Sequence, residues 1–372
     1  MIIAIPKELK ERERRVALVP ETVKELSGKG FKVQVESGAG LLSYFEDVSY
    51  ENAGAQIISD RKSLFSGADV VLAVNAPSAE DISGMKPGCI LISFIFAATS
   101  PETIAAAEKA GISVFSVDAI PRISRAQKMD ALSSQSNLAG YKTVILAANA
   151  LGKIFPMLMT AAGTVKPAKV VIMGAGVAGL QAIATAKRLG ALVEVSDIRP
   201  ETKEQVESLG ARFIEVKGDD SIKTEGGYVK EVSADFLAKQ QALIAKHVAE
   251  ADIVITTALI PGRKAPVLIT DDMVKSMKLG SVIVDMAVEQ GGNCTLSELN
   301  QTVVKSGVTI IGESNLPSLL PMNASQLYAK NISTFLYHLA DSNGFKWESG
   351  EEITAGSLIL RDGKRVHPTV LQ

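Results

Sequence analysis

Short runs of apolar residues, separated by helix-like segments, recur along the whole chain. Each run is short enough to be a buried strand and is entered through a glycine or an Ala-Asp turn. Several runs occur twice with similar sequences: 30–36 and 190–196, 68–74 and 251–257, 85–93 and 277–285, 111–115 and 307–311. This order predicts an α/β fold of two Rossmann-like, doubly wound parallel-sheet domains in tandem, with a cleft between them. Chance resemblance among α/β repeats is the alternative.

The segment 170–180, VVIMGAGVAGL, carries the pattern G-x-G-x-x-G between a predicted strand and a predicted helix. Gly174 permits a tight turn, Gly176 lets the backbone approach a pyrophosphate, and Gly179 allows the helix to pack closely on the strand. The N-terminus of the helix offers N–H groups and the positive end of a dipole to that anion. The segment therefore predicts a dinucleotide site, with a purely structural glycine turn as the alternative.

Asp197 follows the next apolar run. A carboxylate at this place binds the ribose hydroxyls of the adenosine and repels a 2′-phosphate. The predicted cofactor is therefore NAD(H) rather than NADP(H). Arg199 is the one feature against this interpretation, because an arginine nearby can accommodate the phosphate.

Only the second copy of the repeated pattern has a phosphate loop. In the first copy, strand 2–6 leads into the charged segment 7–15, which has no glycine. We therefore expect the first domain to bind no dinucleotide of its own and to supply the opposite wall of the cleft. The tail from Ser325 to Gln372 does not continue the second sheet pattern, and its helix-like part, 327–339, could return the chain to the first domain. The expected domains are residues 1–133 with 325–372, and residues 134–324.

Composition excludes several classes of protein. The 372 residues carry a formal net charge of −2, which offers no basic surface to nucleic acid or to an anionic membrane. The two cysteines, Cys89 and Cys294, suit a reducing compartment and build neither a disulfide framework nor a metal site. The N-terminus turns charged after Pro6, and the longest apolar run, 89–99, is too short to span a bilayer. We expect a soluble chain, which can still dock onto a membrane partner.

A polar loop begins at Pro121, after a predicted strand and at the expected crossing between domains. Ligands bind at the carboxyl ends of parallel strands, and the residue types here suit a nicotinamide. A glutamine can pair with a carboxamide, an arginine held by a carboxylate gives a rigid donor fork, and an aspartate can accept from a ribose hydroxyl. A solvated loop that caps a helix is the alternative.

Long segments of the chain resemble the NAD(H)-binding subunit of proton-translocating nicotinamide nucleotide transhydrogenase. They are 121–141 (PRISRAQKMDALSSQSNLAGY), 174–191 (GAGVAGLQAIATAKRLGA), 201–211 and 256–270 (TTALIPGRKAPVLIT). The resemblance extends from the Ile-Pro-Lys-Glu at 5–8 to the Val-His-Pro at 366–368. It implies that Arg122, Gln127 and Asp130 surround the nicotinamide as the catalytic set. The other implied NAD(H) contacts are Leu132, Ser133, Val177, Asp197, Ile198, Arg199, Gln240 and Leu259.

A further polar segment, 217–229, contains paired glycines and interrupts the second domain between a strand and a helix. Long functional loops often act as lids, and a disordered surface insertion is the alternative. The resemblance implies a mobile loop at this position, in which Tyr228, next to Gly227, closes over the nucleotide.

Alanine dehydrogenases are related to this family and share the Ile-Pro-Lys-Glu opening. Their chemistry needs a cation for the substrate carboxylate and acid–base groups for the imine. The places of their Lys, His and Asp are held here by Asn75, Ile95–Phe96 and Glu289, although Arg15 is retained. These replacements argue against an amino-acid dehydrogenase, and the intact set of Arg122, Gln127 and Asp130 argues against a non-catalytic NAD(H)-binding module; both are kept as alternatives.

The resemblance implies an enzyme subunit that passes a hydride directly between NADH and NADP⁺. NADP(H) would be held by a membrane-spanning partner, without which this chain is inactive, and transfer would be coupled to proton movement across the membrane. Such transfer needs no protein proton donor; it needs two rings held in contact, dry and aligned. A homodimer is also implied, in the cytoplasm and peripheral on the cytoplasmic face of the inner membrane through the partner.

Overall fold

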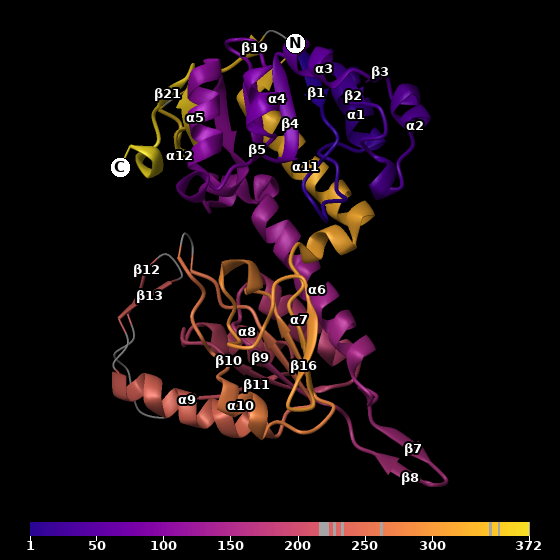
Figure 1. Cartoon of the computed structure of the whole chain (residues 1–372), viewed down its shortest axis with the longest axis vertical. Coiled ribbons are helices and arrows are strands. Elements are labelled where there is room, and N and C mark those ends of the chain that lie inside the picture. Colours follow the sequence, from indigo (N-terminus) through magenta and orange to yellow (C-terminus); the bar gives the residue numbers. More distant parts are fainter. Residues whose placement is uncertain are drawn as a thin grey trace. The chain divides into compact units, whose positions relative to one another are not determined.

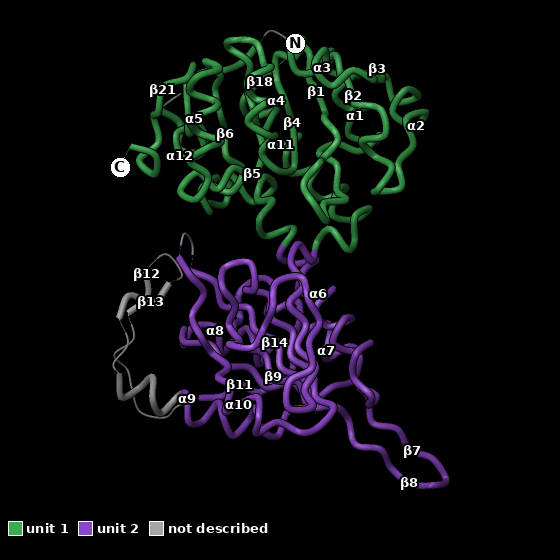
Figure 2. The backbone as a smooth tube through the Cα atoms, viewed as in Figure 1, with its two compact units in different colours: residues 1–135, 317–372 green, residues 136–316 purple. Residues whose placement is uncertain are grey.

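The computed structural model describes residues 1–215, 223–225, 228–231, 234–260, 263–341, 344–348 and 350–371, with side chains described outside 216–240. The chain forms two compact units (Figure 2). The first contains residues 1–135 and 317–372, and the second contains residues 136–316. No helix of the described residues is long and apolar enough to cross a membrane.

The first unit is built on a sheet in the order β21-β20-β6-β5-β4-β1-β2-β3 (Figure 1). Neighbours from β1 to β6 are parallel, and β20 and β21 continue the sheet antiparallel beyond β6. Its strands are β1 (Ile2–Ile5), β2 (Lys32–Glu36), β3 (Gln56–Ile58), β4 (Val70–Asn75), β5 (Ile90–Phe94), β6 (Ser113–Ser116), β20 (Leu358–Arg361) and β21 (Lys364–Arg365).

Both faces of this sheet are buried because its strands are apolar at successive positions. In β4, Val70, Leu72 and Val74 belong to one core cluster and Val71 to the other, as the two-residue period of a strand requires. The helices are α1 (Pro20–Gly28), α2 (Asp47–Asn52), α3 (Arg61–Gly67), α4 (Ala79–Ser83), α5 (Pro101–Ala110), α11 (Pro321–Leu339) and α12 (Glu352–Ser357). A short ladder joins β18 (Ala340–Asp341) and β19 (Gly344–Phe345).

The second unit repeats this plan with the order β11-β10-β9-β14-β15-β17-β16. Its strands are β9 (Lys169–Met173), β10 (Leu192–Ser196), β11 (Arg212–Phe213), β14 (Ile253–Thr256), β15 (Val282–Asp285), β16 (Thr302–Lys305) and β17 (Val308–Ile311). Its helices are α7 (Val177–Arg188), α8 (Thr202–Ser208), α9 (Ala234–Ala249) and α10 (Asp271–Ser276), and α6 (Ala131–Ala150) leads into it. Two antiparallel ladders lie outside the sheet: β7 (Leu158–Thr160) with β8 (Gly163–Val165), and β12 (Lys223–Glu225) with β13 (Tyr228–Glu231).

The two sheets have the same order. The series β3-β2-β1-β4-β5-β6 corresponds strand for strand to β11-β10-β9-β14-β15-β17. Each series then gains an antiparallel strand at the same edge, β20 next to β6 and β16 next to β17. The repeated segments of the sequence overlap β2, β4, β5 and β6 in one unit and β10, β14, β15 and β17 in the other. The predicted class of two Rossmann-like α/β domains is confirmed.

The chain passes between the units at 135/136 and 316/317. The boundaries expected from the sequence were 133/134 and 324/325. Gln135 is tied to the first unit because its side chain accepts from Arg15 at 2.9 Å and donates to the Ala324 carbonyl at 3.0 Å. At the second crossing, the Ser318 hydroxyl accepts from the Arg14 N–H at 2.6 Å. Helix α11 begins at Pro321, a residue favoured at the first helical position.

Candidate functional site

The turn between β9 and α7 has the geometry that its glycines predict. Gly174 has a φ of +104°, which disfavours any side chain, and a Cβ there would overlap the Thr257 hydroxyl. That hydroxyl donates to the carbonyls of Met173 and Gly174, both at 3.2 Å. A Cβ on Gly179 would overlap the carbonyl oxygen of Gly174. Gly174 is therefore required by its backbone conformation and by its contact with Thr257, and Gly179 by the close packing of α7 on the turn.

Gly176 differs from its two neighbours in the motif. Its backbone is extended, with φ −76° and ψ −170°, and a Cβ there would meet nothing within 4 Å. The fold itself therefore does not require glycine at this position. Gly176 is the N-cap of α7, and no side chain caps this helix. The arrangement leaves room for an anion beside the N–H groups that begin α7.

Asp197 lies directly after β10 and is bonded at both oxygens. Its carboxylate accepts from the Ala175 N–H at 2.7 Å, from Arg199 Nε at 2.9 Å and from Arg199 Nη2 at 2.8 Å. Burial opposes its ionisation, but these hydrogen bonds outweigh burial and hold the pKa of Asp197 below its ordinary value. A carboxylate offers about four acceptor positions, and the Arg199 N–H takes another at 2.8 Å. A ribose hydroxyl can therefore bond Asp197 only by replacing one of the hydrogen bonds from Arg199.

Apolar side chains surround this turn at the carboxyl ends of adjacent strands. Val177, Ile198 and Leu259, which follow β9, β10 and β14, are all exposed. Together with Gly174, Gly176, Asp197 and Arg199, they occupy one edge of the second sheet. The other predicted contacts in this unit, Gly227 and the side chains of Tyr228 and Gln240, lie outside the described residues.

Asn293 holds the loop that carries Leu259, and sequence reasoning did not select it. This buried side chain accepts from the Ala258 N–H at 3.1 Å and donates to the carbonyls of Ala258 and Pro266 at 2.9 and 2.7 Å. The signal that could have found it is the pair Gly291 and Gly292, whose φ angles are +91° and +79°. Asn293 follows directly after these two glycines.

The predicted nicotinamide loop belongs to the first unit. It passes through the short 3₁₀ helix η4 (Ser124–Met129) and ends where α6 begins. Ala126 and Met129 are buried in the core, and the Lys128 carbonyl accepts from Asn331 at 2.9 Å. The backbone of the loop is therefore fixed by the fold, and Leu132 packs partly against the same core.

Two of the predicted polar side chains of this loop are exposed, and the third is hydrogen-bonded within the chain. Arg122 and Gln127 are exposed, whereas Asp130 accepts from the N–H and hydroxyl of Ser133 at 2.9 and 2.5 Å and so caps the start of α6. The expected clamp of an arginine by a carboxylate does not form at Arg122 within the described residues. It forms at Arg125, whose Nη2 lies 3.2 Å from Glu351.

A buried polar cluster lies at the carboxyl ends of β1 and β4. The Asn75 amide donates to both Glu8 and Glu13, at 3.0 and 2.9 Å. Arg15 is buried, and its guanidinium bonds both oxygens of Glu13, at 2.8 and 2.7 Å. Burial raises the pKa of Glu8 to about 7. Burial opposes ionisation of Glu13 too, but hydrogen bonds from Arg15 outweigh it and lower that pKa to about 2.

The unaltered chain is expected to lose stability as the pH rises and Glu8 ionises, and Glu8→Gln is expected to prevent this loss. Because the folded pKa of Glu8 is about 7 and its ordinary value is 4.5, the folded chain binds the proton more tightly than the unfolded chain. The free energy of unfolding therefore falls between these pH values. The penalty at higher pH is on the order of 3 kcal/mol.

Urea denaturation of both chains from about pH 4 to about pH 8 measures this effect as the difference between them. The difference should shift in favour of Glu8→Gln as the pH rises and then level off. Glu11→Gln is the control, since Glu11 is exposed on the same segment. A difference that does not change with pH would contradict the role given to Glu8.

Comparisons with known proteins agree with this geometry. The alanine dehydrogenase/PNT N-terminal domain matches residues 4–139, and the alanine dehydrogenase/PNT C-terminal domain matches residues 143–368. An NAD(P) transhydrogenase alpha subunit chain of Rhodospirillum rubrum is 50% identical over 100% of this chain and 99% of its own length. The alanine dehydrogenase of Bacillus subtilis is 35% identical over 93% of this chain and 87% of its own length.

Solved structures give the same result. The transhydrogenase from Sinorhizobium meliloti has a TM-score of 0.90 and 46% identity, covering 98% of this chain and 100% of its own. An L-alanine dehydrogenase has a TM-score of 0.84 and 30% identity, covering 100% of this chain and 98% of its own. Along its full length, the chain is thus similar to transhydrogenase alpha subunits and, less closely, to alanine dehydrogenases. It belongs to the alanine dehydrogenase/PNT family.

Proposed function

We propose that the chain is the NAD(H)-binding subunit of a proton-translocating NAD(P)⁺ transhydrogenase. The observation that carries the proposal is the 50% identity, over the whole chain, to the NAD(P) transhydrogenase alpha subunit chain of Rhodospirillum rubrum. The dinucleotide turn at Gly174–Gly179 supports it. So does the use of Asn75 to bridge two carboxylates, because a neutral amide supplies no cation for an amino-acid carboxylate.

In this proposal the pyrophosphate of NAD(H) binds at the start of α7 and the adenosine ribose binds beside Asp197. The anionic Asp197 repels a 2′-phosphate. It makes three hydrogen bonds with Arg199, so a ribose hydroxyl can replace one of them while Arg199 stays paired and does not attract a phosphate. The cofactor of this chain is therefore NAD(H). The proposed contacts are Arg122, Gln127, Asp130, Leu132, Ser133, Gly174, Gly176, Val177, Gly179, Asp197, Ile198, Arg199, Gly227, Tyr228, Gln240 and Leu259.

The nicotinamide end is assigned to the loop of the first unit. Gln127 pairs with the carboxamide, Arg122 supplies further donors, and Asp130, oriented by Ser133, accepts from a ribose hydroxyl. A hydride carries both bonding electrons from C4 of NADH to C4 of NADP⁺, so that NAD⁺ and NADPH form and no proton moves between the rings. The chain's task is to position and dry the ring rather than to supply acid–base catalysis.

The proposal includes partners. NADP(H) is held by a second, membrane-spanning subunit that couples hydride transfer to proton movement, and this chain is then peripheral on the cytoplasmic face of that membrane. A homodimer is proposed through the β7–β8 hairpin, which projects from the second unit (Figure 1). Met157, Leu158 and Val165 are exposed there, and Met159 is 74% exposed. Apolar side chains so placed on a hairpin are typical of a surface that another chain covers.

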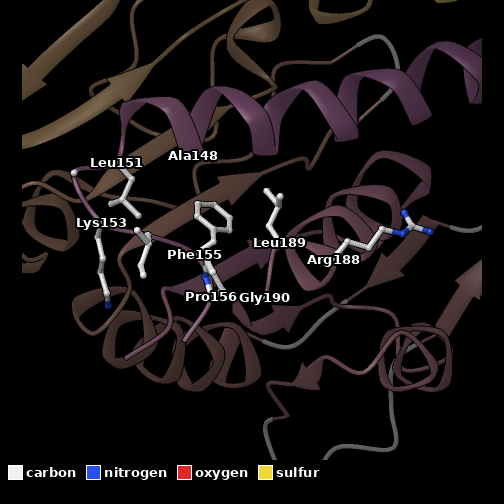
Figure 3. A pocket seen from close by; sticks show the side chains of 10 residues that line it. Ala148, Leu151, Lys153, Phe155, Pro156, Arg188, Leu189 and Gly190 are labelled. Atoms are coloured by element: carbon white, nitrogen blue, oxygen red, sulfur yellow. The ribbon is translucent and has the colours of Figure 1, made fainter. Parts of the chain in front are cut away.

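A groove beside the root of this hairpin supports the same surface. It has a volume of roughly 800 Å³ and lies between the segment after α6 and the end of α7. Leu151, Phe155, Pro156 and Leu189 line it with apolar surface (Figure 3). A second copy of the chain is the proposed occupant. In a two-fold symmetric dimer, both copies use the same surface, here the hairpin and the groove.

Hydride transfer between nucleotides tests the function. The purified chain is mixed with NADH and an NADP⁺ analogue of distinguishable absorbance, with and without the NADP(H)-binding component of a transhydrogenase. We expect turnover only when that component is present and none with NAD⁺ and L-alanine. Turnover with NAD⁺ and L-alanine, without that component, would establish an amino-acid dehydrogenase instead. If the chain binds NADH but transfers no hydride in either assay, it is a binding module.

A further inference from the structure

Phe96 presents an aromatic ring at the carboxyl end of β5. The strand ends at Phe94, and Phe96 follows with φ +50° and ψ +55°, in the left-handed region. A bulky side chain rarely adopts this conformation, which is strained and persists only where the surroundings impose it. The side chain of Phe96 is 50% exposed. The fold thus keeps a strained backbone and an exposed ring together.

The turn is fixed by a carboxylate from the neighbouring strand. The N–H groups of Ile95 and Phe96 both donate to Asp118 Oδ1, at 2.9 and 3.1 Å. The same oxygen accepts from the Ser116 hydroxyl at 2.6 Å. Because Ser116 ends β6 and Asp118 follows it, the conformation of Phe96 is locked to the end of that strand.

The ring itself rests on a rigid support. Phe96 is stacked on Phe94, with ring centroids 5.8 Å apart and an angle of 15° between the planes. Phe94 is buried and packs against the buried Tyr328 of α11 at 5.3 Å between centroids. Phe96 is therefore the exposed end of an aromatic stack whose other members belong to the core.

This stack and the loop assigned to the nicotinamide follow neighbouring strands. Strands β5 and β6 are parallel neighbours, and the chain that leaves β6 continues into the loop carrying Arg122 and Gln127. Ala126 and Met129 of that loop belong to the same core cluster as Phe94. A flat apolar ring and exposed amide and guanidinium groups thus share one edge of the first sheet.

We infer that Phe96 contacts the nicotinamide ring of NAD(H) and forms an apolar wall that keeps water from it. A small-molecule site combines a few polar groups, which fix orientation, with apolar walls. The loop supplies the polar groups for the carboxamide, and the ring of Phe96 supplies a face for the nicotinamide itself. The inference rests on the proposed function, because it takes the loop to be the nicotinamide site.

Comparing NADH with ADP-ribose, which lacks the nicotinamide, tests the inference on the whole chain. Phe96→Ala is expected to weaken NADH binding by about tenfold, since an aromatic contact and its buried area are lost. The affinity for ADP-ribose should stay within about twofold, because the adenosine and pyrophosphate contacts are untouched. The emission maximum of bound NADH should also shift towards its value in water.

Further variants separate contact from stability. Phe96→Gly relieves the backbone strain and should weaken NADH binding as Phe96→Ala does, whereas Phe96→Tyr keeps the ring and should preserve binding. Tyr44→Ala is the matched control: Tyr44 is 64% exposed with a φ of +66°, but it lies on the loop after β2. It should change neither affinity.

The outcomes are distinguishable. If Phe96→Ala weakens NADH and ADP-ribose equally, or weakens neither, the contact is refuted while NAD(H) binding by the chain stands. If the unaltered chain binds neither ligand, the proposed function itself fails, and the inference fails with it. Selective loss of NADH affinity, restored by Phe96→Tyr, is the result we expect.

Discussion

Gly179→Ala is expected to lower the affinity for NADH by at least about 100-fold and to destabilise the second unit. The added methyl group would overlap the carbonyl oxygen of Gly174, which is backbone and cannot rotate away. Helix α7 must then move off β9, although Ala182, Ile183 and Ala186 anchor it in the core. The shift misplaces the N–H groups that begin the helix. Titration calorimetry with NADH and urea denaturation measure the two losses.

Gly176→Ala is expected to separate binding from stability. Nothing lies within 4 Å of a Cβ at this position, and its φ of −76° suits any residue. The unfolding midpoint should therefore stay as it is, while the methyl group occupies the approach of the pyrophosphate and NADH affinity falls by about 100-fold. Gly28→Ala, which also meets open space, is the control for a harmless methyl. Equal stability losses in Gly176→Ala and Gly179→Ala would refute the distinction.

Arg15→Met is expected to destabilise the first unit by about 3 to 5 kcal/mol, because it leaves a buried carboxylate without its countercharge. The guanidinium makes two bonds to Glu13 and one to Gln135, and the Glu13 side chain is fully buried. The methionine fills much of the space but satisfies none of these acceptors. Urea denaturation followed by far-ultraviolet circular dichroism measures the loss.

The double variant Arg15→Met/Glu13→Gln provides the control for charge. Removing the carboxylate as well should recover some of the stability, since no unpaired charge is then buried. The pH dependence should change too. The stability that Glu13 contributes is present above pH 4.5 and is lost as the pH falls towards its folded pKa of about 2. A double variant no more stable than Arg15→Met would show that packing, rather than charge, explains the loss.

The elements of the fold predicted from sequence are those with local signals. Strand β9, the glycine turn and α7 follow one another within a short segment, and the residue types of each predict its conformation. Within the paired segments, the runs 70–74 and 253–255 are apolar at successive positions because both faces of each sheet are buried. Antiparallel additions such as β20 and β16 carry no comparable signal, since their pairing is decided by distant strands.

The same distinction holds for the candidate site. Asp197 and Arg199 were each recognised from position, but their mutual ion pair is visible only in three dimensions. Asn75 was noted for the lysine it replaces, whereas its bridge between Glu8 and Glu13 depends on side chains brought together from β1 and β4. Asn293 escaped notice because its partner, the loop after β14, is distant in sequence and hydrogen-bonds it through backbone groups.

The split of the first unit across the chain has a consequence during synthesis. A ribosome completes residues 136–316 as one uninterrupted segment, so the second unit can fold as soon as it emerges. The first unit has to wait for α11, whose Tyr328, Ile332 and Phe335 are fully buried in its core. Until then, the apolar faces of β1 to β6 on which α11 rests are uncovered. Nascent chains of intermediate length are therefore the stage at which this protein most needs protection from aggregation.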